Sequence, residues 1–202
     1  GGRLVGETQL GGDLANAGVV HIAEANAGGT GVSVDGNYVP RAGSQLSMVL
    51  GYGHLQVDGT ATLEGGNVHV AGVRSGYVTQ AREDVLSATG GISGQFAGVT
   101  SASTIFLDAS LLYTPTAAWL DIRRLDVTAA ALSLADITPA ALGAAQRVET
   151  AFDGIDDQQR DGTGAISDGF IRIAGDFQNT ASAGAASASL RSLSGEVHAA
   201  AA

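Results

Sequence analysis

The sequence contains no cysteine and no lysine, only 3 prolines, and aromatic residues at just 5% of its length. Without cysteine, an exported form of the chain would depend on stacking and hydrogen bonding rather than on disulfides. Its 20 acidic residues outnumber its 10 basic ones, all arginines, and give a formal net charge of −10. This balance disfavours nucleic acid and anionic lipid as partners, because both require a cationic surface. No apolar run approaches about 20 residues, so no membrane-spanning helix is expected.

Glycine and other small residues dominate what remains. The hydrophobic content of 45% excludes wholesale disorder, but 30 glycines and few aromatics argue against an ordinary compact core. Small residues suit architectures in which narrow layers stack at short spacing, as in solenoids. The abrupt Gly-Gly start and the lack of a signal-peptide pattern indicate that the 202 residues are part of a longer chain.

Residues 1–75 show short apolar alternations separated by glycine, asparagine and aspartate. The segments typical of strands are Val19–Ile22, Val32–Val34, Leu46–Val49, Leu55–Val57 and Val68–Val70. Val34–Tyr38 and Val57–Ala61 resemble each other at an offset of 23, and both contain Asp-Gly turns. A period of about twenty residues with three short strands predicts the last coils of a parallel β-helix, whose coils share a core by stacking. An antiparallel sandwich remains the alternative.

Residues 76–130 are predicted to cap the stacked coils. An end coil exposes unpaired backbone groups and an apolar cross-section, which a hairpin could cover. Proline in the Thr114–Thr116 turn stops ladder hydrogen bonding, and in the strand that follows Leu120 and Ile122 share one face while Trp119, Asp121 and Arg123 share the other. The candidate folding and cap residues are Phe96, Phe106, Leu107, Leu112, Tyr113, Trp119, Leu120 and Ile122.

Three segments in this order carry a family resemblance: Leu55–Gly66, Val85–Phe96 and Trp119–Arg124. Together they resemble the C-terminal passenger region, called the autochaperone, of monomeric bacterial autotransporters. Leu190–Ala199 is similar to a segment that lies shortly before the membrane-anchored β-barrel in subtilisin-like members. Gly76–Asp84 departs from the family pattern because it is more charged.

The resemblance implies a role in type V secretion. The segment would fold early at the cell surface of a Gram-negative bacterium and nucleate folding of the passenger β-helix, supporting its secretion across the outer membrane. Its implied partners are the upstream passenger β-helix, its own C-terminal β-barrel and the outer-membrane assembly machinery, with the chain a monomer. The fragment would not itself be an enzyme, although the full-length parent could carry an upstream catalytic domain such as a serine protease.

Residues 131–202 change to a helical period. Thr138 is a plausible N-cap with Pro139 at the first helical position. Three apolar stripes at helical spacing predict three short amphipathic helices: Leu142, Ala145, Val148 and Phe152; Ile166, Phe170, Ile173 and Phe177; and Leu190, Leu193 and Val197. Gly154 and the run Asp156–Gly162 are interpreted as a polar loop. The predicted fold class is therefore mainly β: a right-handed parallel β-helix (solenoid) end with a capping β-hairpin region, followed by a small α-helical subdomain.

No motif points to catalysis, a metal or a cofactor. The four histidines, His21, His54, His69 and His198, have no metal-ligand spacing. No Gly-x-Ser-x-Gly nucleophile elbow occurs. The acids Asp156, Asp157 and Asp161 lack the order of a calcium loop, and Gly28, Gly29 and Gly31 precede a strand rather than opening a phosphate-binding helix.

Two alternative functions also fit the sequence. One is a β-helical adhesin module that binds a host or cell-surface ligand. The other is a β-helical carbohydrate-active enzyme, for which Asp35 and Asp58 recur one period apart, although both sit in turns that already account for an aspartate. Aromatics and acids along one lateral face would favour either alternative, whereas a crowded terminal cap would favour the folding role.

Overall fold

The computed structural model describes residues 2–5, 8–22, 31–73, 76–101, 103–162 and 166–195. The chain divides into two compact units. Unit 1 comprises Gly1–Arg74, Ala81–Ala102 and Ala109–Ile122, and unit 2 comprises Ser75–Gln80, Ser103–Asp108 and Arg123–Ala202. Unit 2 is thus assembled from three separate stretches, whereas the sequence predicted three consecutive segments.

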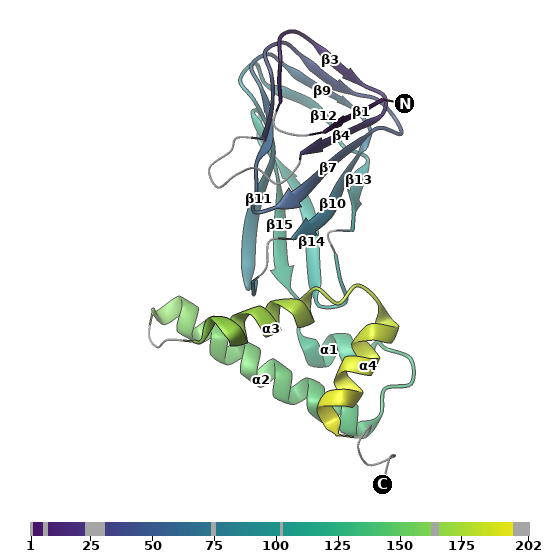
Figure 1. The fold of residues 1–202 in the computed structure, drawn as a ribbon, viewed down its shortest axis with the longest axis vertical. Helices are drawn as coiled ribbons and strands as arrows, with labels where there is room; N and C mark the ends of the chain where they lie inside the picture. The colour runs from purple at the N-terminus through teal and green to yellow at the C-terminus, as the bar shows by residue number, and fades with distance from the viewer. Residues whose placement is uncertain are drawn as a thin grey trace. The chain divides into compact units, whose positions relative to one another are not determined.

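The strands form three sheets (Figure 1). From β1 to β13, successive strands join the first, second and third sheet in turn, so that strands three apart in the chain belong to the same sheet. The first sheet has the order β1 (Arg3–Val5), β4 (Val19–Ile22), β7 (Gln45–Leu50), β10 (Asn67–Val73) and β13 (Gly98–Thr100). The second has the order β14 (Leu107–Tyr113), β15 (Ala117–Arg124), β11 (Gln80–Ala88), β8 (His54–Val57), β5 (Gly31–Val34) and β2 (Thr8–Leu10). The third has the order β12 (Ile92–Gln95), β9 (Ala61–Glu64), β6 (Tyr38–Pro40) and β3 (Leu14–Asn16).

The strands from β1 to β13 pair in parallel wherever a register is defined, which contradicts the antiparallel sandwich. Val34 pairs with Val57, so the correspondence predicted at an offset of 23 is confirmed. Alternate side chains point inward, and the core includes the fully buried Val32, Leu55 and Leu86 of adjacent strands. Stacking these apolar columns buries a continuous core that no single layer could form alone.

The turns after β2, β5 and β8 are held by a ladder of side-chain hydrogen bonds. Asp13 Oδ1 accepts from Asn37 N at 2.7 Å, and Asn37 Oδ1 accepts from Thr60 N at 2.9 Å. The stacked backbones also require glycine at close approaches: a Cβ on Gly94, where φ is +75°, would lie 2.2 Å from the Leu63 carbonyl oxygen. These turn residues therefore stabilise the stack, and turn chemistry accounts for their type.

Two strands at the end of the second sheet depart from the parallel pattern. Only three residues connect β14 and β15, which neighbour each other in the sheet, so the two form an antiparallel hairpin. Ala88 N donates to Thr116 O and Arg124 N donates to Thr79 O, so β15 also runs antiparallel to β11. The predicted hairpin is present, and it continues the second sheet beyond β11.

Four helices lie in the described part of unit 2: α1 (Val127–Leu132), α2 (Pro139–Asp161), α3 (Asp168–Gln178) and α4 (Ala183–Ser194). The predicted start of α2 is confirmed, because Thr138 Oγ1 accepts from Ala141 N and Pro139 occupies the first position. α1 was not predicted; Asp126 caps it by accepting from Ala129 N. None of these helices has both the length and the apolar character needed to cross a membrane.

The three predicted helices are present as α2, α3 and α4, but the predicted polar loop was wrong and two of the apolar stripes are buried only in part. Residues 154–161 continue α2 instead of forming a loop, because Ile155 packs into the core of unit 2 and Asp156 is buried among hydrogen-bond donors. The stripe of α3 is divided: Ile166 and Phe177 pack against the core, whereas Phe170 and Ile173 are exposed. Leu193 is exposed as well, and Val197 lies outside the described residues.

The architecture is therefore mixed α/β, with parallel and mixed sheets. The expectation of a mainly β chain underestimated the helical part, since helices occupy most of the chain between Val127 and Ser194.

Candidate functional site

The predicted cap residues do not form a single cluster. In unit 1, Phe96, Leu120 and Ile122 are buried, Tyr113 and Trp119 are half-buried, and Leu112 is 41% exposed. Phe106 and Leu107 belong to unit 2 and are buried, and Phe106 is part of the apolar core of that unit. Of the residues predicted to face outward from β15, Asp121 is also buried.

The hairpin of unit 1 contacts the last parallel strands through its turn. Ile92, the first residue of β12, donates its backbone N–H to the Pro115 carbonyl at 2.6 Å. Phe96, which follows β12, donates its N–H to the Tyr113 hydroxyl at 3.2 Å, and burial raises the pKa of that hydroxyl above its ordinary value. These bonds satisfy backbone groups at the end of the third sheet that would otherwise be unpaired.

Trp119 lies under an arginine. The Arg82 guanidinium carbon is 4.0 Å from the centre of the Trp119 ring, within the range of a cation–π contact, and Arg82 also pairs with Asp84 at 3.4 Å. Leu120, next in the strand, is fully buried. Trp119 thus contacts an exposed charged side chain, and Leu120 supplies the inward packing of β15.

Unit 2 contains a cluster of charged side chains that is centred on the guanidinium of Arg124. Nη1 donates to Glu149 at 2.6 Å, Nε to Asp156 at 2.6 Å and Nη2 to Asp153 at 2.5 Å. The three carboxylates project from successive turns of α2. The side chains of Arg124, Glu149 and Asp156 are 12%, 13% and 9% exposed, so these two ion pairs are largely shielded from water. Asp153 is exposed.

Residues before β11 join the same cluster. The Tyr77 hydroxyl donates to Asp156 at 2.9 Å, and Thr79 Oγ1 also donates to Asp156. Burial and the bond to Asp156 raise the pKa of Tyr77 far above its ordinary value, so this hydroxyl stays a donor. Burial of the Arg124 guanidinium opposes its charge, but the bonds to Glu149 and Asp156 outweigh burial and raise the pKa of Arg124.

An amide clamp lies at the end of α3. Gln178, only 1% exposed, accepts from Val78 N through Oε1 at 2.9 Å and donates Nε2 to Val78 O at 2.8 Å. Thr104 Oγ1 donates to the Gln178 carbonyl at 2.6 Å. Neither this clamp nor the Arg124 cluster was predicted from the sequence. A buried glutamine on an apolar helix face could have indicated the clamp, but its partner is 100 residues away.

The three described histidines each contact a hydroxyl on a neighbouring strand: His21 with Ser47 at 2.9 Å, His54 with Ser87 at 3.2 Å, and His69 with Thr100 at 3.0 Å. His198 lies outside the described residues, as do Gly28 and Gly29. Within the described residues, no group of three or more His, Cys, Asp or Glu residues could hold a metal ion. The histidines thus fit outward-facing strand positions that bridge adjacent strands.

His54 gives unit 1 a pH dependence. Burial lowers the pKa of its imidazole below the ordinary 6.5, and the nearby Asp84 carboxylate opposes this only in part. The unfolded chain therefore binds this proton more readily than the folded chain does. The contribution of neutral His54 to the free energy of unfolding is fully present above pH 6.5, and it is lost as the pH falls from 6.5 to the pKa of the folded state. We expect the urea midpoint of unit 1, followed by Trp119 fluorescence, to decrease between about pH 7.5 and about pH 5. His54→Gln should flatten this decrease, whereas His69→Gln should retain the His54 contribution; equal slopes in His54→Gln and the parent chain would contradict the assignment.

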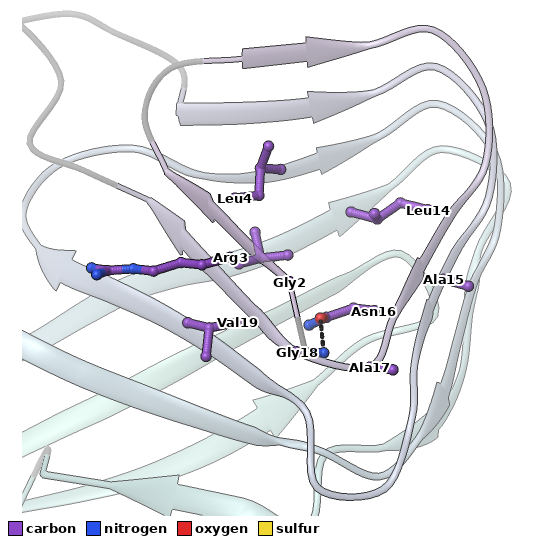
Figure 2. Close-up of a pocket in the computed structure, with 10 residues that line it drawn as sticks. Gly2, Arg3, Leu4, Leu14, Ala15, Asn16, Ala17, Gly18 and Val19 are labelled. Carbon is purple, nitrogen blue, oxygen red and sulfur yellow. Dashed lines mark hydrogen bonds between the residues drawn. The ribbon is translucent and has the colours of Figure 1, made fainter.

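A shallow pocket of about 360 Å³ opens beside the first strands of unit 1 (Figure 2). Leu4, Leu14 and Val20 contribute apolar surface, and among the described lining residues Asn16 is the one polar uncharged side chain. Asn16 is engaged internally, since its Oδ1 accepts from Gly18 N at 2.9 Å and its Nδ2 donates to Gln45 O at 3.2 Å. The pocket therefore presents no constellation suited to catalysis.

No protein-family model matches the chain, and a comparison with curated proteins finds no significant relative. The function is accordingly inferred from the geometry of the sheets, the hairpin and the helical unit.

Proposed function

We propose that unit 1 is the end of a right-handed parallel β-helix and that the β14–β15 hairpin caps it. The order of strands in the three sheets supports the coiled path, because strands three apart in sequence stack in register. The contacts of the hairpin turn with Ile92 and Phe96 support the cap. The proposal rests above all on these hydrogen bonds between the hairpin and the end of the parallel strands.

The proposed activity is that of an autochaperone: a folding template for the passenger β-helix of an autotransporter, which supports its secretion across the outer membrane. The physical argument concerns nucleation. The first coil must lose chain entropy without a neighbour on which to pack, whereas each later coil adds to an existing surface. A terminal unit that is already capped supplies that surface and lowers the barrier for the coils that follow. The family resemblance adds the location, the cell surface of a Gram-negative bacterium.

The adhesin and enzyme alternatives receive no specific support from the described side chains. Among the described residues of unit 1, the exposed large apolar side chains are Val5 of β1 and Leu112 of β14, which belong to different sheets. Asp35, the aspartate that recurs with Asp58, accepts from Gln9 Nε2 at 3.0 Å in a turn. The Asp13–Asn37–Thr60 ladder likewise uses its polar groups for stacking. We therefore favour the folding role.

The test is surface display of the parent protein in a Gram-negative host. Leu120→Asp places a carboxylate at a fully buried position of the hairpin, and we expect loss of a protease-resistant displayed passenger while the barrel remains inserted. Leu112→Asp changes an exposed leucine of the same hairpin and should leave display intact. Undiminished display with Leu120→Asp would overturn the proposal.

A further inference from the structure

The three stretches that assemble unit 2 have one property in common. Ser75–Gln80 leads into β11, Ser103–Asp108 leads into β14, and β15 ends at the beginning of Arg123–Ala202. These strands are the consecutive neighbours β14, β15 and β11 at the end of the second sheet. One end of each of these three strands, the start of β11, the start of β14 and the end of β15, thus belongs to unit 2.

Each stretch is held in unit 2 by specific bonds to the helices or to the segment between α3 and α4. Gln178 of α3 bonds both backbone groups of Val78, and Ile105 N donates to Thr180 O at 3.2 Å. Arg124 is fixed by carboxylates of α2. The stretches also bond one another, because Arg124 N donates to Thr79 O at 3.0 Å and Leu125 N donates to Phe106 O at 2.8 Å.

Aromatic side chains of the stretches also pack against aromatic side chains of the helices. Phe106 stacks on Phe177 of α3 with ring centres 4.6 Å apart, and Tyr77 meets Phe152 of α2 edge-on at 4.9 Å. The Phe152 and Phe177 rings lie 6.0 Å apart, so the two contacts belong to one cluster. The bonds fix which residues of the three stretches lie opposite one another, and the aromatic rings supply apolar burial that is independent of the coils.

We propose that unit 2 is a folding clasp: its helices form first, capture the three stretches, and thereby set the register of β11, β15 and β14 before the parallel coils assemble. Helices rely on local contacts and form quickly, whereas parallel strands need long-range closure and form slowly. A one-residue slip would turn every inward side chain of β15 outward, so a fixed register is a precondition for the cap. This inference deepens the proposed function and rests on it.

Pulse-labelled hydrogen exchange during refolding of the complete chain from urea tests the order directly. The amides of Val78, Ile105 and Leu125 report capture, and those of Asp35 and Asp58, which donate to Leu10 O and Val34 O, report the coils. We expect the first three to gain protection before the last two. Earlier or simultaneous protection of the coil amides would overturn the clasp.

The variant Gln178→Ala distinguishes an effect of unit 2 on the folding rate of the coils from an effect on their stability alone. Loss of both bonds to Val78 should slow protection of the coil amides roughly tenfold while leaving their unfolding rate unchanged. Gln158→Ala, at an exposed position on α2, is the matched control and should leave both rates unchanged. An unchanged coil folding rate in Gln178→Ala would contradict the clasp, yet it would leave the display result for Leu120→Asp unaffected, so the two proposals fail separately.

Discussion

Replacing Arg124 with leucine is expected to destabilise unit 2 by about 3–5 kcal/mol, because it removes one partner of a shielded charge cluster. Asp156 and Glu149 would keep their burial but lose the guanidinium that compensates their charge. Tyr77 and Thr79 would still donate to Asp156, but two hydroxyls do not neutralise a carboxylate. Asp153 adds little to the expected loss, because its side chain is 61% exposed.

The measurement is urea unfolding followed by helical circular dichroism, which reports unit 2. Arg160→Leu is the matched control, since Arg160 pairs with Asp157 at 2.9 Å on an exposed surface, and its loss should change stability by less than about 1 kcal/mol. Arg124→Lys should fall between the two, because a single ammonium cannot make the three divergent bonds of the guanidinium. Similar losses for Arg124→Leu and Arg160→Leu would show that the cluster does not hold unit 2 together.

Replacing Leu120 with alanine is expected to destabilise unit 1 by about 2–5 kcal/mol. Leu120 is 0% exposed in β15, between the pairing partners β14 and β11, and truncation leaves a cavity in addition to the lost apolar burial. The loss should appear in urea unfolding followed by fluorescence of Trp119, the single tryptophan of the chain, which lies in the same strand.

Leu112→Ala is the control for this change, because Leu112 is in the same hairpin but 41% exposed. Its replacement should alter stability by no more than about 0.5–1 kcal/mol. A loss for Leu112→Ala as large as that for Leu120→Ala would mean that the inward face of the hairpin is no better packed than its outward face.

The stacked strands could be predicted from the sequence because their causes are local. Alternation such as Val32, Ser33, Val34 follows the two-residue period of a strand with one face buried. The offset between Asn37 and Thr60 reflects a direct bond, Asn37 Oδ1 accepting from Thr60 N, between positions 23 residues apart. The sequence also placed the hairpin turn correctly at Thr114–Thr116, where proline interrupts the ladder.

The cluster and the clamp could not be predicted, because their partners are distant in sequence. Asp156 and Asp157 lie in an acidic run after Gly154, which by local propensity indicates a loop. The fold overrides this preference, since Asp156 bonds Arg124 and Tyr77, 32 and 79 residues away. The predicted cap residues divided between the units for a similar reason: the hydrophobicity of Phe106 is clear from the sequence, but not that it joins the core of unit 2.

Hydrogen exchange in native Leu120→Asn is the sharpest test of whether the hairpin stabilises the parallel strands of unit 1. We expect the amides of Asp35 and Asp58, in turns remote in sequence from the substitution, to lose protection relative to the parent chain and to Leu112→Asn. Unchanged protection at Asp35 and Asp58, with exchange increased only in β14 and β15, would contradict the claim that the parallel strands depend on the hairpin.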